Sequence, residues 1–274
     1  MAVFLSGLAA LVWGVADFLG GFATKKSATT WVSFLAAAAG LAMALIASPL
    51  ISDLILVEIA WGCAAGVGGA LGIGLLYHGL GVGPVGVVAP ISAVVAAVVP
   101  FVVGVAFFSE RPSAQALIGS ALAFIAILMI TFERTETQAT KGIILMATGA
   151  GVGFGLFFVF LNFTSPDAGL WPLVGSKGTN TLLLGIVVAF QRTYRVSERT
   201  YRLPLLAGVL DMAANVAVLF ALRTGPLSMV AVVTGLYPIT TIVLARNILH
   251  EHFRKVQLAG IALALAATAL IAGG

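Results

Sequence analysis

Long apolar stretches separated by short polar breaks dominate the pattern of this chain. A membrane-spanning helix needs about 20 mostly apolar residues at a rise of about 1.5 Å each, and ten segments of roughly that length lie between the charged and turn-forming stretches. The pattern therefore predicts ten transmembrane helices, near residues 3–22, 31–50, 56–77, 84–107, 114–132, 142–163, 170–190, 204–222, 227–248 and 255–272. The breaks are too short to hold a soluble domain.

Similar stretches recur in the two halves of the chain at an offset of 141 or 142 residues. The matching stretches are Glu110 to Gly119 with Glu251 to Gly260, GPVGVVAP from residue 83 with GPLSMVAV from residue 225, and Trp13-Gly14 with Phe154-Gly155. They indicate duplication of a five-helix unit, with repeats at residues 1–137 and 138–274. Because five is odd, the second copy enters the membrane from the opposite side. The predicted fold is an all-α polytopic membrane protein made of two inverted five-helix repeats, an arrangement that in transporters places the substrate site between the halves.

Glycines in the third predicted span indicate close helix packing. Gly62 and Gly66 are four residues apart, as are Gly68 and Gly72. Small residues at this spacing let the backbone of another helix approach within a membrane. We therefore expect this span to lie against neighbouring helices at close range.

The composition supports a membrane protein and excludes several other classes. Hydrophobic residues make up 61% of the chain and charged residues 9%, whereas soluble proteins have about a quarter charged. The net charge of +4 is scattered between apolar runs, which argues against a nucleic-acid partner. The single Cys63 cannot form an internal disulfide, and no Cys/His cluster has the spacing of a metal site. We expect no metal and no cofactor.

Lysine and arginine residues are distributed unequally between the two sides of the predicted bundle. We name the side on which the chain begins side A and the other side B. Two basic residues fall on side A and eleven on side B, and the positive-inside rule then makes side B cytoplasmic. On side A these are Arg111 and Arg223; on side B they are Lys25, Lys26, Arg134, Lys141, Arg192, Arg195, Arg199, Arg202, Arg246, Arg254 and Lys255. Both termini are then predicted to face outward.

The turn between the fourth and fifth spans of each half carries a glutamate, in FFSERPS and in ILHEHFR, followed by a Gly-containing apolar helix. Pro238 precedes Glu251 by thirteen residues, and Ala97 takes the equivalent place in the first half. With ten spans in two halves, the chain resembles EamA-type proteins of the drug/metabolite transporter superfamily over nearly its whole length. The resemblance implies a bacterial inner-membrane transporter, commonly an exporter of amino acids, metabolites or amphiphilic compounds. It also implies cytoplasmic termini, opposite to the charge count.

Three charged residues lie well inside predicted spans, namely Asp17, Lys177 and Asp211. A charge at the centre of a spanning helix costs about 2.5 to 3.5 kcal/mol, so each needs a partner or water. At the helical rise, Asp17 lies about 21 Å from side A, Asp211 about 18 Å and Lys177 about 10 Å. The two carboxylates thus share a depth. The long stem of Lys177 can reach either of them.

Polar and aromatic neighbours occur at helical spacing around these charges. Trp13 precedes Asp17 by four residues, Asn215 follows Asp211 by four, and Asn180 and Thr181 follow Lys177 by three and four. Residues at this spacing share a helix face, so we expect the three faces to line a polar cavity. His78, at the end of the third span, is a further candidate for the substrate or proton pathway.

Structural alternatives remain open for these candidates. Asp17 and Asp211 are alternatively helix-packing or interfacial residues, Lys177 alternatively extends to side A, and His78 alternatively lies at the membrane interface. Glu110 and Glu251 are interpreted as residues that fix turns at helix ends.

The pattern favours a secondary transporter of a small polar or amphiphilic metabolite, such as an amino acid or amine, with alternating access around a central cavity. Export and proton coupling are part of this hypothesis, with Asp17 or Asp211 as proton carrier or as counter-ion for an amine. The alternative is a passive channel or a non-transporting scaffold. An enzyme is not expected, since no Ser/His/Asp or H-E-x-x-H pattern appears. The expected partners are a small-molecule substrate and the lipid bilayer, and a homodimer is left open.

Overall fold

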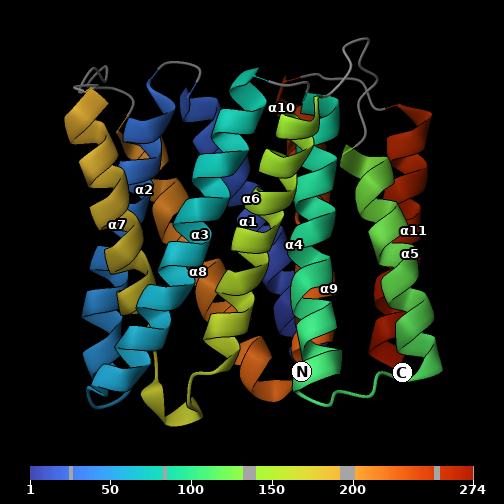
Figure 1. The fold of residues 1–274 in the computed structure, drawn as a ribbon, viewed down its shortest axis with the longest axis horizontal. Helices are drawn as coiled ribbons and strands as arrows, with labels where there is room; N and C mark the ends of the chain where they lie inside the picture. The colour runs from blue at the N-terminus through green and yellow to red at the C-terminus, as the bar shows by residue number, and fades with distance from the viewer. Residues whose placement is uncertain (25–26, 83–84, 132–139, 192–200, 250–253, 274) are drawn as a thin grey trace.

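The computed structural model describes residues 1–24, 27–82, 85–131, 140–191, 201–249 and 254–273, and this part of the chain is helical (Figure 1). The helices run along a common axis, and both ends of the chain lie on side A, at the bottom of Figure 1. They are α1 (Ala2–Thr24), α2 (Thr29–Ala47), α3 (Leu56–Val82), α4 (Val85–Phe107), α5 (Ala114–Thr131), α6 (Lys141–Asn162), α7 (Trp171–Gln191), α8 (Arg202–Thr224), α9 (Leu227–Thr234), α10 (Pro238–Leu249) and α11 (Lys255–Gly273), with short 3-10 turns η1 (Ser48–Leu50) and η2 (Pro166–Ala168).

The helices agree with the ten spans expected from the hydrophobic pattern. Among the described residues, nine helical segments are long and apolar enough to cross a membrane, and the apolar stretch Ala114–Ile130 of α5 is a shorter tenth. The prediction of an all-α fold with membrane-length apolar helices is confirmed for the described part of the chain.

The ninth span differs from the prediction because it is interrupted between α9 and α10. Pro238 has no N–H to donate to Thr234, four residues before it. The N–H of Tyr237 donates to the Thr234 carbonyl instead, at 3.1 Å, in a tighter 3-10 type turn. At the equivalent position in the first half stands Ala97, and α4 is continuous there.

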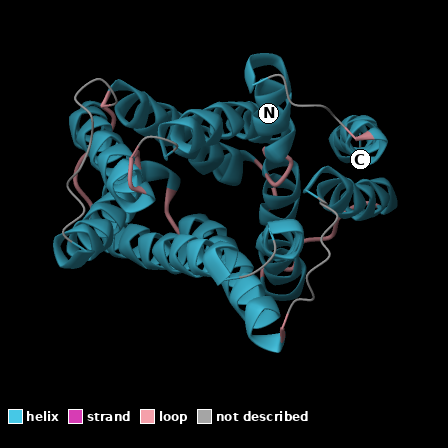
Figure 2. Cartoon of the chain, turned by 90° about the horizontal axis from the view of Figure 1, so that it is seen from above, coloured by secondary structure: helices cyan, strands magenta, loops and turns pink. Residues whose placement is uncertain are grey.

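Eight of the ten spans form a closed ring in which neighbours alternate between the two halves of the chain (Figure 2). The order around the ring is α1, α8, α2, α7, α3, α6, α4 and then α9 with α10, which returns to α1. The remaining helices, α5 and α11, pack on each other outside the ring, at one end of the molecule (Figure 1). Neither half forms this ring by itself, so the halves depend on each other for their packing.

Glycines bring the backbones of neighbouring helices together, as predicted for α3. A Cβ atom at Gly62 would overlap the carbonyl of Pro172 in α7, and one at Gly66 would lie 2.7 Å from the carbonyl oxygen of Ser176. Gly68 and Gly72 make the same kind of approach to α6. In lipid, where apolar side chains give little drive for helix association, such contacts supply the packing.

Some of these contacts repeat at the offset seen in the sequence. In the first pair of contacts, Gly14 lies against Thr240, and the residues equivalent to them, Gly155 and Val99, also lie against each other. In the second pair, Gly119 lies against Ile271, and the equivalent residues Gly260 and Ile130 make the same contact. These are the contacts expected when the two halves exchange roles. The inverted two-fold relation itself stays a prediction.

The largest cluster of buried residues lies at side A. The largest buried cluster includes the side A ends of α1, α6, α8 and α9, and every residue of α9 except Met229 is buried. Aromatic rings extend this cluster, with Trp61 stacked on Phe163 at 4.9 Å between ring centroids. Ile239–Leu244 of α10, nearer side B, are only half-buried. The ring is therefore packed more tightly at side A than at side B.

We predict that Gly62→Ala destabilises the protein and that Gly74→Ala, on the same helix, does not. The added methyl group at Gly62 meets the α7 backbone, whereas nothing lies within 4 Å of a Cβ at Gly74. Overpacking of this kind costs about 1–3 kcal/mol. Thermal unfolding of the purified variants in detergent measures the difference, and equal melting temperatures would contradict the proposed contact.

Candidate functional site

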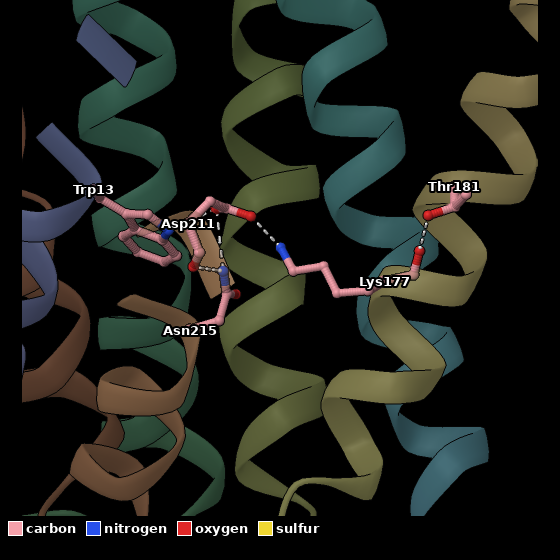
Figure 3. A network of polar contacts seen from close by, with 5 residues as sticks. All are labelled: Trp13, Lys177, Thr181, Asp211 and Asn215. Carbon is pink, nitrogen blue, oxygen red and sulfur yellow. Dashed lines mark hydrogen bonds and ion pairs between the residues drawn. The ribbon is translucent and has the colours of Figure 1, made fainter. Parts of the chain in front are cut away.

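Asp211 is the centre of a polar network in the middle of the bundle (Figure 3). Its Oδ1 accepts hydrogen bonds from the indole Nε1 of Trp13 at 2.9 Å and from the Nδ2 of Asn215 at 3.1 Å. Its Oδ2 forms an ion pair with the Nζ of Lys177. One carboxylate is thus held by an aromatic N–H, an amide and an ammonium group, on α1, α8 and α7.

Local helix geometry places the polar groups of α7 and α8. Asn215 follows Asp211 by one turn, and its Nδ2 also donates to the Asp211 carbonyl oxygen at 2.6 Å. Thr181 follows Lys177 by one turn, and its hydroxyl donates to the Lys177 carbonyl oxygen at 2.7 Å (Figure 3). These contacts agree with the shared helix faces expected for Asp211 with Asn215 and for Lys177 with Thr181.

Lys177 is deeply buried and has its countercharge at Asp211. Its side chain is 6% exposed, and that of Asp211 is 33% exposed. Gly40 of α2 clears the space for the lysine stem, since a Cβ there would lie 3.4 Å from the Lys177 Cδ. A buried ammonium is tolerated only with a close partner. The ion pair replaces the alternative in which Lys177 extends to side A.

Trp13 reaches Asp211 from the first half of the chain and is held by aromatic neighbours. Its ring packs edge-on against Phe158, with 6.0 Å between centroids, and lies 6.5 Å from the ring of Phe157. Both phenylalanines are buried in α6. Sequence reasoning did not select this pair, although the aromatic run FGLFFVF from residue 154 was a signal for it.

Asp17 lies on the interior face of α1, without a partner in the part of the chain that the structure describes. It makes no hydrogen bond or ion pair with any residue that the structure describes, and it is exposed. The apolar residues Leu8 and Leu11 of α1 are also exposed. Leu8 precedes Asp17 by nine residues, about two and a half turns, so the two side chains lie on opposite sides of the helix. Asp17 therefore points away from the lipid-facing stripe, on the same side of α1 as Trp13.

Exposure increases along this interior face from side A to side B. Ser6 is fully buried and Ala10 is 7% exposed, Trp13 is half-buried, and Asp17 and Gly21 are exposed. Residues at this spacing follow one face of a helix. On this face of α1 the side chains are therefore packed at side A and become more accessible toward side B.

The other predicted site residues lie outside the Asp211 network. The Oδ1 of Asn180 is buried and has no hydrogen-bond partner among the described residues, and a Cβ at Gly69 of α3 would lie 3.9 Å from it. His78 is exposed near the side B end of α3. Their pathway roles stay predictions. Glu251, His250, His252 and most of the side B basic residues lie outside the described residues.

We predict that Asp211→Asn destabilises the protein more than Lys177→Met does, and that the double variant recovers part of the loss. Asp211→Asn leaves a nearly inaccessible ammonium without a countercharge, and breaking a buried pair in this way costs about 3–5 kcal/mol. Lys177→Met leaves a partly exposed carboxylate that keeps two hydrogen-bond donors. Thermal unfolding in detergent gives the order, and strictly additive losses would contradict a direct ion pair.

Comparison with known proteins identifies the family. Residues 140–273 match the model of the EamA-like transporter family. A solved crystal structure of a protein is similar over 98% of this chain and 95% of that chain, with a TM-score of 0.77 and 14% sequence identity, which shows a shared fold. No curated protein matches the sequence. From its membrane-length helices the chain is a multi-pass membrane protein, and its second half, residues 140–273, belongs to the EamA-like transporter family of the drug/metabolite transporter superfamily.

Proposed function

We propose that the protein is a secondary transporter that moves a small polar or amphiphilic metabolite, such as an amino acid or amine, by alternating access. The observation that carries the proposal is the carboxylate of Asp17, which has no partner among the described residues and is exposed on the inward face of α1, nearer side B than the buried cluster at side A. Such a charge is expensive within a membrane unless a ligand, a proton or water satisfies it.

The charges define what the interior attracts. Asp211 and Lys177 neutralise each other, whereas Asp17 has no countercharge among the described residues and adds a negative charge near that of Asp211. A group of positive charge binds there favourably, either the amine of a substrate or a proton. Trp13, one turn away, offers an aromatic surface to the apolar part of such a substrate.

An inverted repeat supplies the conformational change that the proposal requires. The alternation of the halves around the ring and the glycine contacts related by 141 residues support it. Rocking one half against the other closes side B and opens side A around a fixed central site. If side B is cytoplasmic, the cavity opens toward the compartment from which an exporter takes its substrate.

A passive channel or a non-transporting scaffold is the alternative. A channel in this state has to conduct past the buried cluster at side A, and a scaffold gains nothing from an accessible interior carboxylate. Both observations favour a transporter.

We predict that Asp17→Asn abolishes most substrate flux in proteoliposomes and that Asp53→Asn leaves it unchanged. Both substitutions remove one carboxylate, but Asp53 lies exposed in the loop between α2 and α3. A thermal-shift screen over amino acids, polyamines and quaternary amines identifies the substrate for the assay. Normal flux in the Asp17→Asn variant would remove the proposed role.

The same assay with an imposed pH gradient distinguishes proton coupling from facilitated diffusion. Coupled transport accelerates when protons flow opposite to the substrate, and this acceleration is lost in Asp17→Asn. Facilitated transport shows no response to the gradient.

For orientation in a bacterial inner membrane, the charge count predicts that both termini face the periplasm. A reporter fused to the C-terminus that is active only outside the cytoplasm should then give a signal. A reporter active only in the cytoplasm would instead support the orientation implied by the family resemblance.

A further inference from the structure

Glu110, in the first half of the chain, is bound to the start of a helix in the second half. Its Oε1 accepts a hydrogen bond from the backbone N–H of Leu227 at 2.6 Å, and its Oε2 accepts one from Ser228 at 3.0 Å. These are the first two residues of α9, and the preceding residue, Pro226, provides no side-chain cap. An anionic group at this position satisfies free N–H groups and favours the helix dipole.

The backbone conformation of the turn before Glu110 positions this carboxylate. Ser109 has a φ of 56°, in the left-handed region that a residue with a side chain rarely adopts. The N–H of Glu110 donates to the Gly104 carbonyl oxygen at 3.1 Å, and a side chain at Gly104 would overlap the Glu110 carboxylate. Strain of this kind persists where surrounding contacts enforce it.

A second carboxylate joins the two halves at the same side of the membrane. Glu58, at the start of α3, is 7% exposed, and its Oε2 accepts a hydrogen bond from the N–H of Ser165 at 3.0 Å. Ser165 lies in the connection between α6 and α7. Arg223 of α8 holds the same connection through bonds to the carbonyl oxygens of Ser165 and Gly169, at 3.1 and 2.7 Å.

We propose that Glu110 and Glu58 are gate residues that keep side A closed, each by binding backbone N–H groups of the opposite half. The helix that Glu110 holds, α9, is buried on nearly all sides and lies in the packed region that closes side A. Opening side A separates the halves there and therefore breaks both contacts. The strength of these bonds sets how often the cavity opens to side A, independently of which substrate it carries.

The test measures access to Ser6 in a background with Cys63→Ala. Ser6 lies on the interior face of α1, two turns from Trp13 toward side A, and is fully buried with no hydrogen-bond partner among the described residues. Ser6→Cys therefore removes no hydrogen bond and reports opening by its rate of reaction with a soluble maleimide in detergent. Leu50→Cys, at a position that is 82% exposed on side A, reports the intrinsic reactivity.

We predict that Glu110→Gln raises the labelling rate of Ser6→Cys about tenfold, equivalent to about 1.4 kcal/mol. The amide replaces one of the two acceptor oxygens with a donor that faces a backbone N–H, and the remaining bond loses its charge. Glu58→Ala should raise the rate as well. The matched control is Ser113→Ala in the same loop. It removes a hydrogen bond within the first half, from the Ala116 N–H to the Ser113 Oγ at 3.1 Å. This variant should leave the labelling rate of Ser6→Cys unchanged.

Two outcomes would overturn the gate proposal. One is an unchanged labelling rate in both glutamate variants at an unchanged melting temperature; the other is an equal rise in Ser113→Ala, which indicates general loosening. If Glu110→Gln does not fold, Glu110→Asp tests the same contact, because the shorter side chain reaches at most one of the two N–H groups. Labelling needs no substrate, so failure of the transport proposal would leave this result standing, and the reverse also holds.

Discussion

The charge of Asp211 inside the membrane is the constraint on which the surrounding arrangement depends. A carboxylate in this environment needs a countercharge and hydrogen-bond donors, and Asp211 obtains them from Lys177, Trp13 and Asn215. The donors lie on three helices and in both halves of the chain. Satisfying one charge therefore fixes α1, α7 and α8 relative to one another. Because the pair is neutral, Asp17 is left without a countercharge among the described residues.

Close backbone contacts make this arrangement compact in a solvent that does not drive apolar association. Gly62 lets α3 lie directly against α7, and Gly208 does the same between α8 and α2, where a Cβ would overlap Ala36. Since neighbours around the ring alternate between halves, these contacts lie between the halves. When one half moves against the other, the helices therefore have to slide past each other at these glycine contacts. The hydrogen bonds of Glu110 and Glu58 add a polar connection at the side where the packing is tightest.

The two halves share a pattern of contacts but differ in chemistry. The residue equivalent to Asp17 at the 141-residue offset is Phe158, which packs against Trp13 instead of carrying a charge. The residue equivalent to Ala97 is Pro238, which goes with the break between α9 and α10. Asp17 therefore has no charged counterpart in the second half, and the interrupted helix of the second half has no counterpart in the first. Similar scaffolds can carry an asymmetric site because helix packing depends on small residues, whereas the site depends on a few polar ones.

The sequence by itself determined the number and approximate positions of the apolar spans, because the thickness of a bilayer fixes the length of a span. It also placed Asp17, Asp211 and Lys177 at membrane depth, and it indicated the close approach at Gly62. It left open which carboxylate binds Lys177, since position along a helix gives height but not direction across the bundle. Only the tertiary structure decided this, because α2 brings α7 and α8 together and Gly40 leaves room for the lysine stem. The break before Pro238 and the link from Glu110 to α9 were likewise decided there, since an apolar pattern does not record which backbone groups lack a partner.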